Sequence, residues 1–258
     1  MQRQVDTARL TSSKTVRSSV GVLASKLGST PSVRNPKIAL IGGLTVAALV
    51  MFLMSEFVRR SVWLGLWGLT NDLEGLSPFF ASDKPVVTFL MFLHMITGAA
   101  MILFCPLQLI GSLRRKYPRL HRWNGRLLAT LGLVTGAGGV FYALLRGTTG
   151  GTYMDVSSTL YGVLFLLASV QTLRFGLKRS WAQHRRWGLR LVTLGLASWF
   201  YRLHYVVWHE FFGDLWITPD MRGPFDVFQA FAFYLSYLFL LELFFLWEKS
   251  RRPTPQRA

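Results

Sequence analysis

The chain has 258 residues, of which 51% are hydrophobic and only 16% are charged. Soluble domains carry about 25% charged residues, so this composition excludes an ordinary soluble protein and favours a membrane protein. The formal net charge of +17 lies in short stretches between long apolar runs. That distribution argues against nucleic-acid binding and for a basic membrane surface.

Residues 1–36 are basic and rich in Ser and Thr, so we expect a largely disordered tail with at most a short helix at Val20–Leu27. Six apolar runs follow, and each approaches or exceeds the roughly 20 residues that a helix needs to cross a bilayer. The runs are Ile38–Val58, Val86–Gly111, Leu127–Leu145, Val156–Leu173, Leu189–Trp208 and Phe225–Trp247.

Helices are the natural form of such runs, because a backbone in lipid must satisfy its own hydrogen bonds. The sequence therefore predicts an all-α fold, a polytopic bundle of about six transmembrane helices over residues 37–248. A basic tail over residues 249–258 follows it. Within the bundle, Pro85 suits a helix start, Asp155 an N-cap and Pro106 a kink.

Lysine and arginine collect at alternate breaks between the runs. The N-terminal tail holds 7 of the 29, the second-to-third connection 6, the fourth-to-fifth connection 6 and the C-terminal tail 4. The opposite side keeps the remaining six. The positive-inside rule then predicts a multi-pass protein of the cell membrane with both termini in the cytoplasm.

This sidedness sorts the five histidines into two groups. His94 and His204 lie near the outer ends of the second and fifth runs, with His209 just beyond in a solvated Trp-His-Glu segment. His121 and His184 lie at the inner starts of the third and fifth helices. An ionisable residue inside a membrane segment predicts a functional site, although such a histidine can also simply bond to a neighbouring helix.

Imidazole is an axial ligand of b-type haem, so His94 and His204 are candidate iron ligands. Gly98, four residues after His94, leaves one helix face open to a flat ring, and Arg202 is a candidate partner for a propionate. A second haem at His121 and His184 suits the spacing poorly. His184 and His204 are 20 residues apart, which is about 30 Å along a continuous helix.

A belt of basic and aromatic residues accompanies the inner histidines. Guanidinium groups bind phosphate or carboxylate, and tryptophans mark the headgroup level of a bilayer. We expect this belt to bind anionic lipid headgroups or, in a sharper version, an anionic substrate or a quinone. Its candidate anion-binding residues are Arg114, Arg115, Arg122, Arg126, Arg185, Arg186 and Arg190.

The remaining polar features are less specific. Glu56 and Glu242 are candidates for a proton path or for pairing with arginine, and Cys105 suits inert packing inside an apolar run. Gly132 and Gly136 favour close helix packing, with a cofactor lying against them as the alternative. The outer loops carry a set of acidic residues that we expect to be solvated: Asp72, Glu74, Asp83, Glu210, Asp214, Asp220 and Asp226.

Several blocks are similar to known proteins: His94-x3-Gly98, Pro-x-Leu-His121-Arg-Trp-Asn-Gly-Arg126, His184-Arg-Arg-Trp and Arg202-Leu-His204. Over residues 86–208 the chain resembles a bacterial and fungal family of predicted multi-pass membrane proteins of unknown function. A fainter resemblance is to the ascorbate-reducible six-helix transmembrane cytochromes b. That resemblance implies His94 and His204 as outer haem ligands and His121 and His184 as inner ones.

Two functions follow from the sequence. The first is a haem- or quinone-linked redox protein of the membrane, with an outer site at His94 and His204. The alternative is a non-enzymatic transporter, or a scaffold that binds lipid or a partner through the inner Arg/His belt. The sequence leaves open whether the chain is an enzyme.

Overall fold

The structure, a computed structural model, describes residues 36–70 and 85–251. The chain divides into two compact units, residues 1–43 and 44–258. The described part of the first unit, residues 36–43, is helical, and all contacts discussed below lie in the second. Apart from Pro36 and residues 249–251, the two predicted tails lie outside the described residues, as do Val20–Leu27, Asp72, Glu74 and Asp83.

The described residues are helical nearly throughout, which confirms the predicted all-α fold. The helices are α2 (Pro36–Thr70), α3 (Pro85–Leu109), α4 (Gly111–Lys116), α5 (Pro118–Leu145), α6 (Thr152–Leu177), α7 (Trp181–Phe212) and α8 (Pro224–Ser250). Every predicted run lies largely within one of the six long helices. Most of the helices extend beyond the runs because polar flanks also form helix, whereas α3 ends at Leu109, two residues before the end of its predicted run. The short basic helix α4 was not predicted.

Five of the described helices are long and apolar enough to cross a membrane, namely α2, α3, α5, α6 and α8. The predicted fifth span, Leu189–Trp208, lies within the continuous 32-residue helix α7. This helix is more polar than the others because it carries Arg185, Arg186, Arg190 and Arg202 among its apolar residues. Its length of about 48 Å at 1.5 Å per residue exceeds the thickness of a hydrocarbon core.

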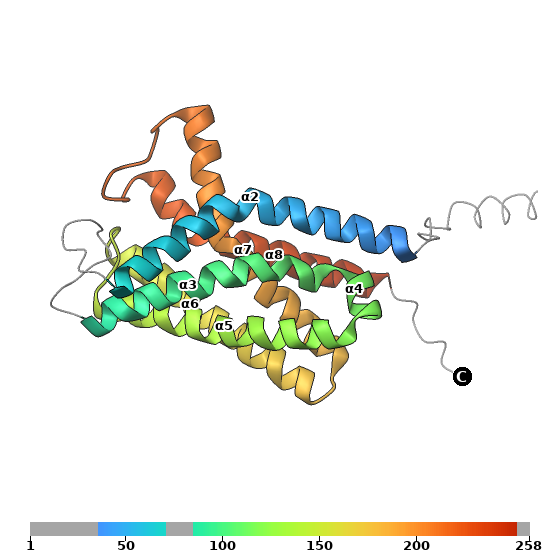
Figure 1. Cartoon of the computed structure of the whole chain (residues 1–258). Coiled ribbons are helices and arrows are strands. Elements are labelled where there is room, and N and C mark those ends of the chain that lie inside the picture. Colours follow the sequence, from blue (N-terminus) through green and yellow to red (C-terminus); the bar gives the residue numbers. More distant parts are fainter. Residues whose placement is uncertain (1–35, 71–84, 252–258) are drawn as a thin grey trace, which may run out of the picture. The chain divides into compact units, whose positions relative to one another are not determined.

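The helices of the second unit pack in chain order, α3 against α5, α5 against α6, α6 against α7 and α7 against α8 (Figure 1). Glycine allows the close α5–α6 contact. A Cβ on Gly132 would overlap the Ser169 hydroxyl, and one on Gly136 would lie 3.0 Å from Leu166. The predicted close-packing role of these glycines therefore holds, and Cys105 is fully buried in the same core as expected.

Two sequence assignments at helix starts and loops were wrong. Asp155 is not an N-cap; it lies in the first turn of α6 and accepts hydrogen bonds from the backbone and the hydroxyl of Thr148. Asp226 is not solvated but fully buried at the start of α8. It accepts bonds from the Tyr205 hydroxyl at 2.7 Å and from the backbone of Thr218 and Gly223 at 3.0 Å.

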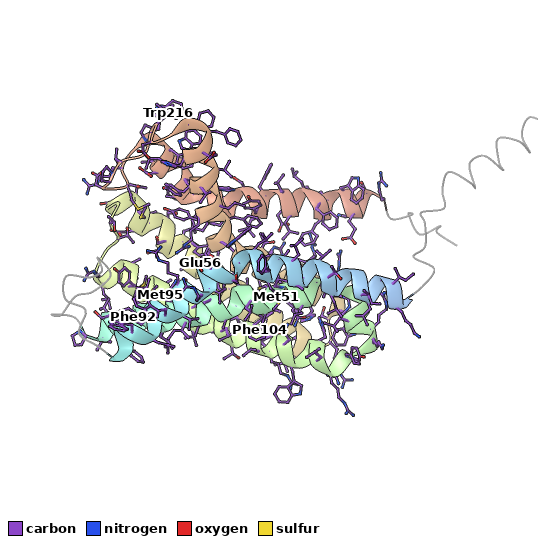
Figure 2. The ribbon with its side chains drawn as sticks, turned by 45° about the horizontal axis from the view of Figure 1, so that its top comes forward. Met51, Glu56, Phe92, Met95, Phe104 and Trp216 are labelled. Atoms are coloured by element: carbon purple, nitrogen blue, oxygen red, sulfur yellow. The ribbon has the colours of Figure 1, made fainter. Side chains whose placement is uncertain are left out.

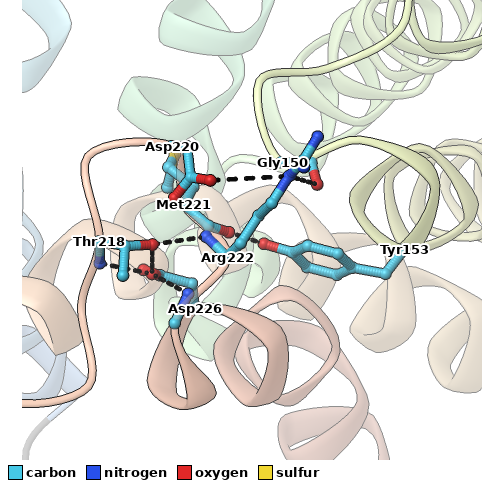
Figure 3. Close-up of polar contacts among 8 residues, drawn as sticks. Gly150, Tyr153, Thr218, Asp220, Met221, Arg222 and Asp226 are labelled. Carbon is cyan, nitrogen blue, oxygen red and sulfur yellow. Dashed lines mark hydrogen bonds and ion pairs between the residues drawn. The ribbon is translucent and has the colours of Figure 1, made fainter.

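These bonds hold the loop between α7 and α8 in place (Figure 3). The Tyr153 hydroxyl of α6 donates to the Met221 carbonyl, and Arg222 donates to the Gly150 carbonyl. The Thr218 hydroxyl, as a hydrogen-bond donor, lowers the pKa of the exposed carboxyl of Asp220. Trp216, which Figure 2 labels, lies on the same loop and stacks against Trp208 near the end of α7.

Candidate functional site

His94 is held in a socket on the neighbouring helix α5. Its Nδ1 lies 2.7 Å from the Thr135 carbonyl oxygen, and the Thr135 hydroxyl donates to Thr97 on α3. Gly138 and Gly139 make room for the ring, because a Cβ on either would lie 3.1 to 3.2 Å from His94 atoms. A carbonyl oxygen can only accept, so Nδ1 carries a proton, and in the neutral imidazole Nε2 keeps its lone pair.

His184 repeats this arrangement between α7 and α6. Its Nδ1 lies 3.0 Å from the Thr172 carbonyl oxygen, and a Cβ on Gly176 would come within 3.1 Å of the ring. Each socket is therefore a threonine carbonyl followed four residues later by a glycine. His184 also interacts electrostatically with His121 on α5.

His204 differs from these two because both its ring nitrogens are engaged. Nδ1 lies 2.8 Å from the Gln229 amide nitrogen, and Nε2 lies 2.8 Å from the Tyr237 hydroxyl, both on α8. Iron ligation requires a nitrogen lone pair, so His204 would have to release one of these partners. The predicted His94–His204 haem site thus stays a prediction, and its two histidines bond to different helices.

Arg202 lies between α7 and α2. Its guanidinium carbon is 4.2 Å from the centre of the Phe57 ring, it donates to the Ser198 carbonyl, and it interacts electrostatically with His94. Gly98 packs against α5, because a Cβ at this position would lie 3.5 Å from the methyl group of Thr135. Among the described residues, no group of three or more His, Cys, Asp and Glu side chains is arranged to hold a metal ion.

The predicted carboxylates have arginine partners. Glu56 and Arg59 form an exposed ion pair within α2, where Figure 2 labels Glu56. Arg190 on α7 bonds to Glu242 on α8 through both Nε and a terminal nitrogen, each at 2.7 Å. Of the two roles predicted for Glu56 and Glu242, a proton path or pairing with arginine, the structure shows the pairing for both.

Arginines of the predicted anion-binding belt fall into two kinds. Arg185 pairs with Glu248 at 2.7 Å, and Arg186 lies over the Phe245 ring at 4.9 Å. The α4–α5 members of the belt are exposed at the protein surface. In the part of the chain that the structure describes, no ion pair joins a carboxylate to them; they are Arg114, Arg115, Arg122 and Arg126.

A cleft of about 440 Å³ opens between α6, α7 and α8. Its walls are apolar except for Arg190 and Glu242. Arg190 is held there from several sides, since its guanidinium carbon also lies 4.6 Å from the Trp187 ring and 5.4 Å from the Phe245 ring. The other lining residues are Leu164, Leu167, Ala168, Trp187, Leu194, Leu235, Leu238 and Phe239.

Residues 91–239 match a protein family described as "Predicted membrane protein (DUF2306)". The chain belongs to this family. No curated protein and no solved structure matches the chain. The comparisons therefore confirm the resemblance to a membrane family of unknown function and lend no support to the fainter likeness to the cytochromes b.

The residues matched by the family include most of the candidate site. It includes His94, His121, His184 and His204, and every residue of the cleft wall except Glu242. Sequence reasoning missed the cleft and the partners of His204. Gln229 was a usable signal, since an amide in an apolar run needs a polar partner when it is buried.

Proposed function

We propose that this membrane protein binds a quinone-type molecule, an apolar chain with an oxygen-bearing ring, in the cleft between α6, α7 and α8. The observation that carries the proposal is the Arg190–Glu242 ion pair in the wall of an otherwise apolar cleft. Lipophilic ligand sites are mostly apolar with few polar groups that fix orientation, and 440 Å³ falls within their usual size of roughly 300–1,000 Å³.

The polar groups of the cleft suit the ring of such a ligand. A guanidinium has five N–H donors, more than one carboxylate oxygen can accept, and both contacts of Arg190 use Oε1 of Glu242. Arg190 would donate a hydrogen bond to a ring carbonyl oxygen. The Trp187 ring offers a flat apolar surface beside it, and Glu242, with 43% of its side chain exposed, would hold the Arg190 guanidinium in place.

Binding can be measured with the purified protein in phosphatidylcholine nanodiscs. Decylubiquinone is titrated and its binding is measured by isothermal titration calorimetry, because the chain holds nine tryptophans and fluorescence would not report Trp187 alone. We expect saturable binding that weakens at least tenfold in Leu238→Trp, which fills the cleft, and in Arg190→Gln. The same titration with a saturated fatty alcohol separates a quinone site from a general apolar site.

The matched control is Glu248→Gln, which breaks the Arg185–Glu248 pair on the same two helices but outside the cleft wall. It should bind decylubiquinone as the unaltered protein does. Unchanged binding in a folded Leu238→Trp protein would reject the cleft as the site, and equal binding of the fatty alcohol would reject the quinone class. Melting temperature and helix content confirm that each variant is folded.

A second candidate function is b-type haem binding with His94 as an axial ligand, a role that the sequence predicts for His94 together with His204. The observation that favours it is the Nδ1 contact to the Thr135 carbonyl, because histidines that bind metal through Nε2 usually donate Nδ1–H in this way. A bound haem would supply one-electron transfer. Its test is the visible spectrum of protein from haem-replete cells: a Soret band lost in His94→Ala supports this function, and a colourless folded protein rejects it.

A further inference from the structure

Three arginines and a tryptophan share one exposed face of α5, directly after α4. Arg119, Arg122 and Arg126 follow each other at spacings of three and four residues, with Trp123 among them, so helical geometry places all four on one side. All four are exposed, Trp123 at 69% of its surface, and Arg126 lies 5.6 Å from the centre of the Trp123 ring.

The adjacent strip of the same helix is apolar and also exposed, with Leu120 at 47% and Leu127 at 42%. The opposite face holds buried Asn124 and Leu128, and Asn124 donates to the Phe104 carbonyl on α3. The first turns of α5 therefore bury one face in the protein. They present an arginine stripe and, beside it, an apolar stripe.

These arginines lack the partners that other arginines of the chain have. Within residues 36–70 and 85–251, no ion pair joins Arg119, Arg122 or Arg126 to a carboxylate, whereas Arg185 and Arg190 each have a glutamate on α8. The acidic residues of the described chain lie elsewhere. Three unneutralised cations within about 10 Å of helix length repel one another unless an external anion binds among them.

We propose that this face of α5 binds the headgroup of an anionic phospholipid. Guanidinium groups match phosphate oxygens in charge and geometry, tryptophan prefers the headgroup level, and the leucine stripe suits the first part of an acyl chain. The site is separate from the cleft between α6, α7 and α8, and it does not depend on the function proposed above.

The test is lipid selectivity of the full chain, measured by native mass spectrometry of protein released from mixed detergent and lipid. Phosphatidylglycerol competes with phosphatidylcholine for the unaltered protein and for the triple variant Arg119→Gln, Arg122→Gln, Arg126→Gln. Each cation that lies close to the bound anionic headgroup contributes roughly fivefold to lipid binding. We therefore expect the triple variant to lose at least tenfold of the preference for phosphatidylglycerol.

A matched control removes the same charge from the ends of α6 and α8, through Arg174→Gln, Lys178→Gln and Lys249→Gln. It should keep most of the preference, because those cations do not share the α5 face. Equal loss in both triple variants would overturn the proposal in favour of a general charge effect. Displacement of bound lipid by millimolar inorganic phosphate would overturn the lipid assignment.

Discussion

The arginines of α7 and those of α5 show two uses of the same residue within the second unit. Arg185 and Arg190 reach glutamates on α8, so their charges are neutralised within the protein and connect two helices. Arg119, Arg122 and Arg126 of α5 are exposed with no such partner in the described chain. The role of a basic stretch thus depends on whether a carboxylate of another helix lies opposite it. The sequence of the stretch itself does not show this.

The two α7 pairs also differ from each other, and the largest expected effect separates them. Replacing Arg190 and Glu242 together by leucine should abolish measurable quinone binding, a loss on the order of a hundredfold, since the charge-assisted donor to the ligand and the carboxylate that holds it are both removed. The fold should persist, because an apolar replacement of an ion pair costs little stability. Decylubiquinone titration and a melting curve measure the two properties.

The equivalent change of Arg185 and Glu248 to leucine should leave ligand binding within about threefold of the unaltered protein. Both residues lie outside the cleft wall, with 40% and 31% of their side chains exposed. A comparable loss of binding in this variant would mean that the two pairs act alike, and it would contradict the claim that only the Arg190–Glu242 pair belongs to the ligand site.

A smaller effect is the coupling free energy within each pair. In a double-mutant cycle with alanine, Arg190 and Glu242 should couple by about 1–2 kcal/mol, because Arg190, with only 20% of its side chain exposed, contacts the carboxylate through two nitrogens. Arg185 and Glu248 should couple by about 0.2–1 kcal/mol, the range of exposed pairs. Unfolding in a mild denaturing detergent gives the four stabilities of each cycle.

A separate effect comes from giving the α5 arginines a partner of their own. Trp123→Glu places a carboxylate four residues after Arg119 and three before Arg126, spacings at which helix side chains pair. Preference for phosphatidylglycerol should fall about fivefold in native mass spectrometry, relative to Trp123→Gln as the control. If both substitutions lower the preference equally, the tryptophan ring rather than the arginine charge is responsible.

The sequence predicted the helices well because long apolar runs have one stable form in lipid. It missed the extent of α2, which continues 12 residues past Val58 through the helical Glu56–Arg59 pair, and it missed the six residues of α4. The sidedness of the two termini remains a prediction from the positions of lysine and arginine. Cysteine labelling from each side of the membrane would test it.

The site was predictable only in part. His94 was recognisable as a polar residue in an apolar run, but its partner is a backbone carbonyl 41 residues away, which no side-chain pattern reveals. Glu242 and Arg190 were each identified, yet their pairing across 52 residues depends on how α7 meets α8. The cleft could not be predicted from the sequence, because leucine residues occur both in cleft walls and on surfaces that face lipid.

The most direct test of the proposed function is photolabelling with an azido-substituted ubiquinone, followed by peptide mass spectrometry of the protein in nanodiscs. The account predicts labels on α6, α7 and α8 near Trp187 and Leu238, suppressed by excess decylubiquinone and reduced in Arg190→Gln. Labels spread evenly over the lipid-facing helices, or confined to α3 and α5, would contradict it.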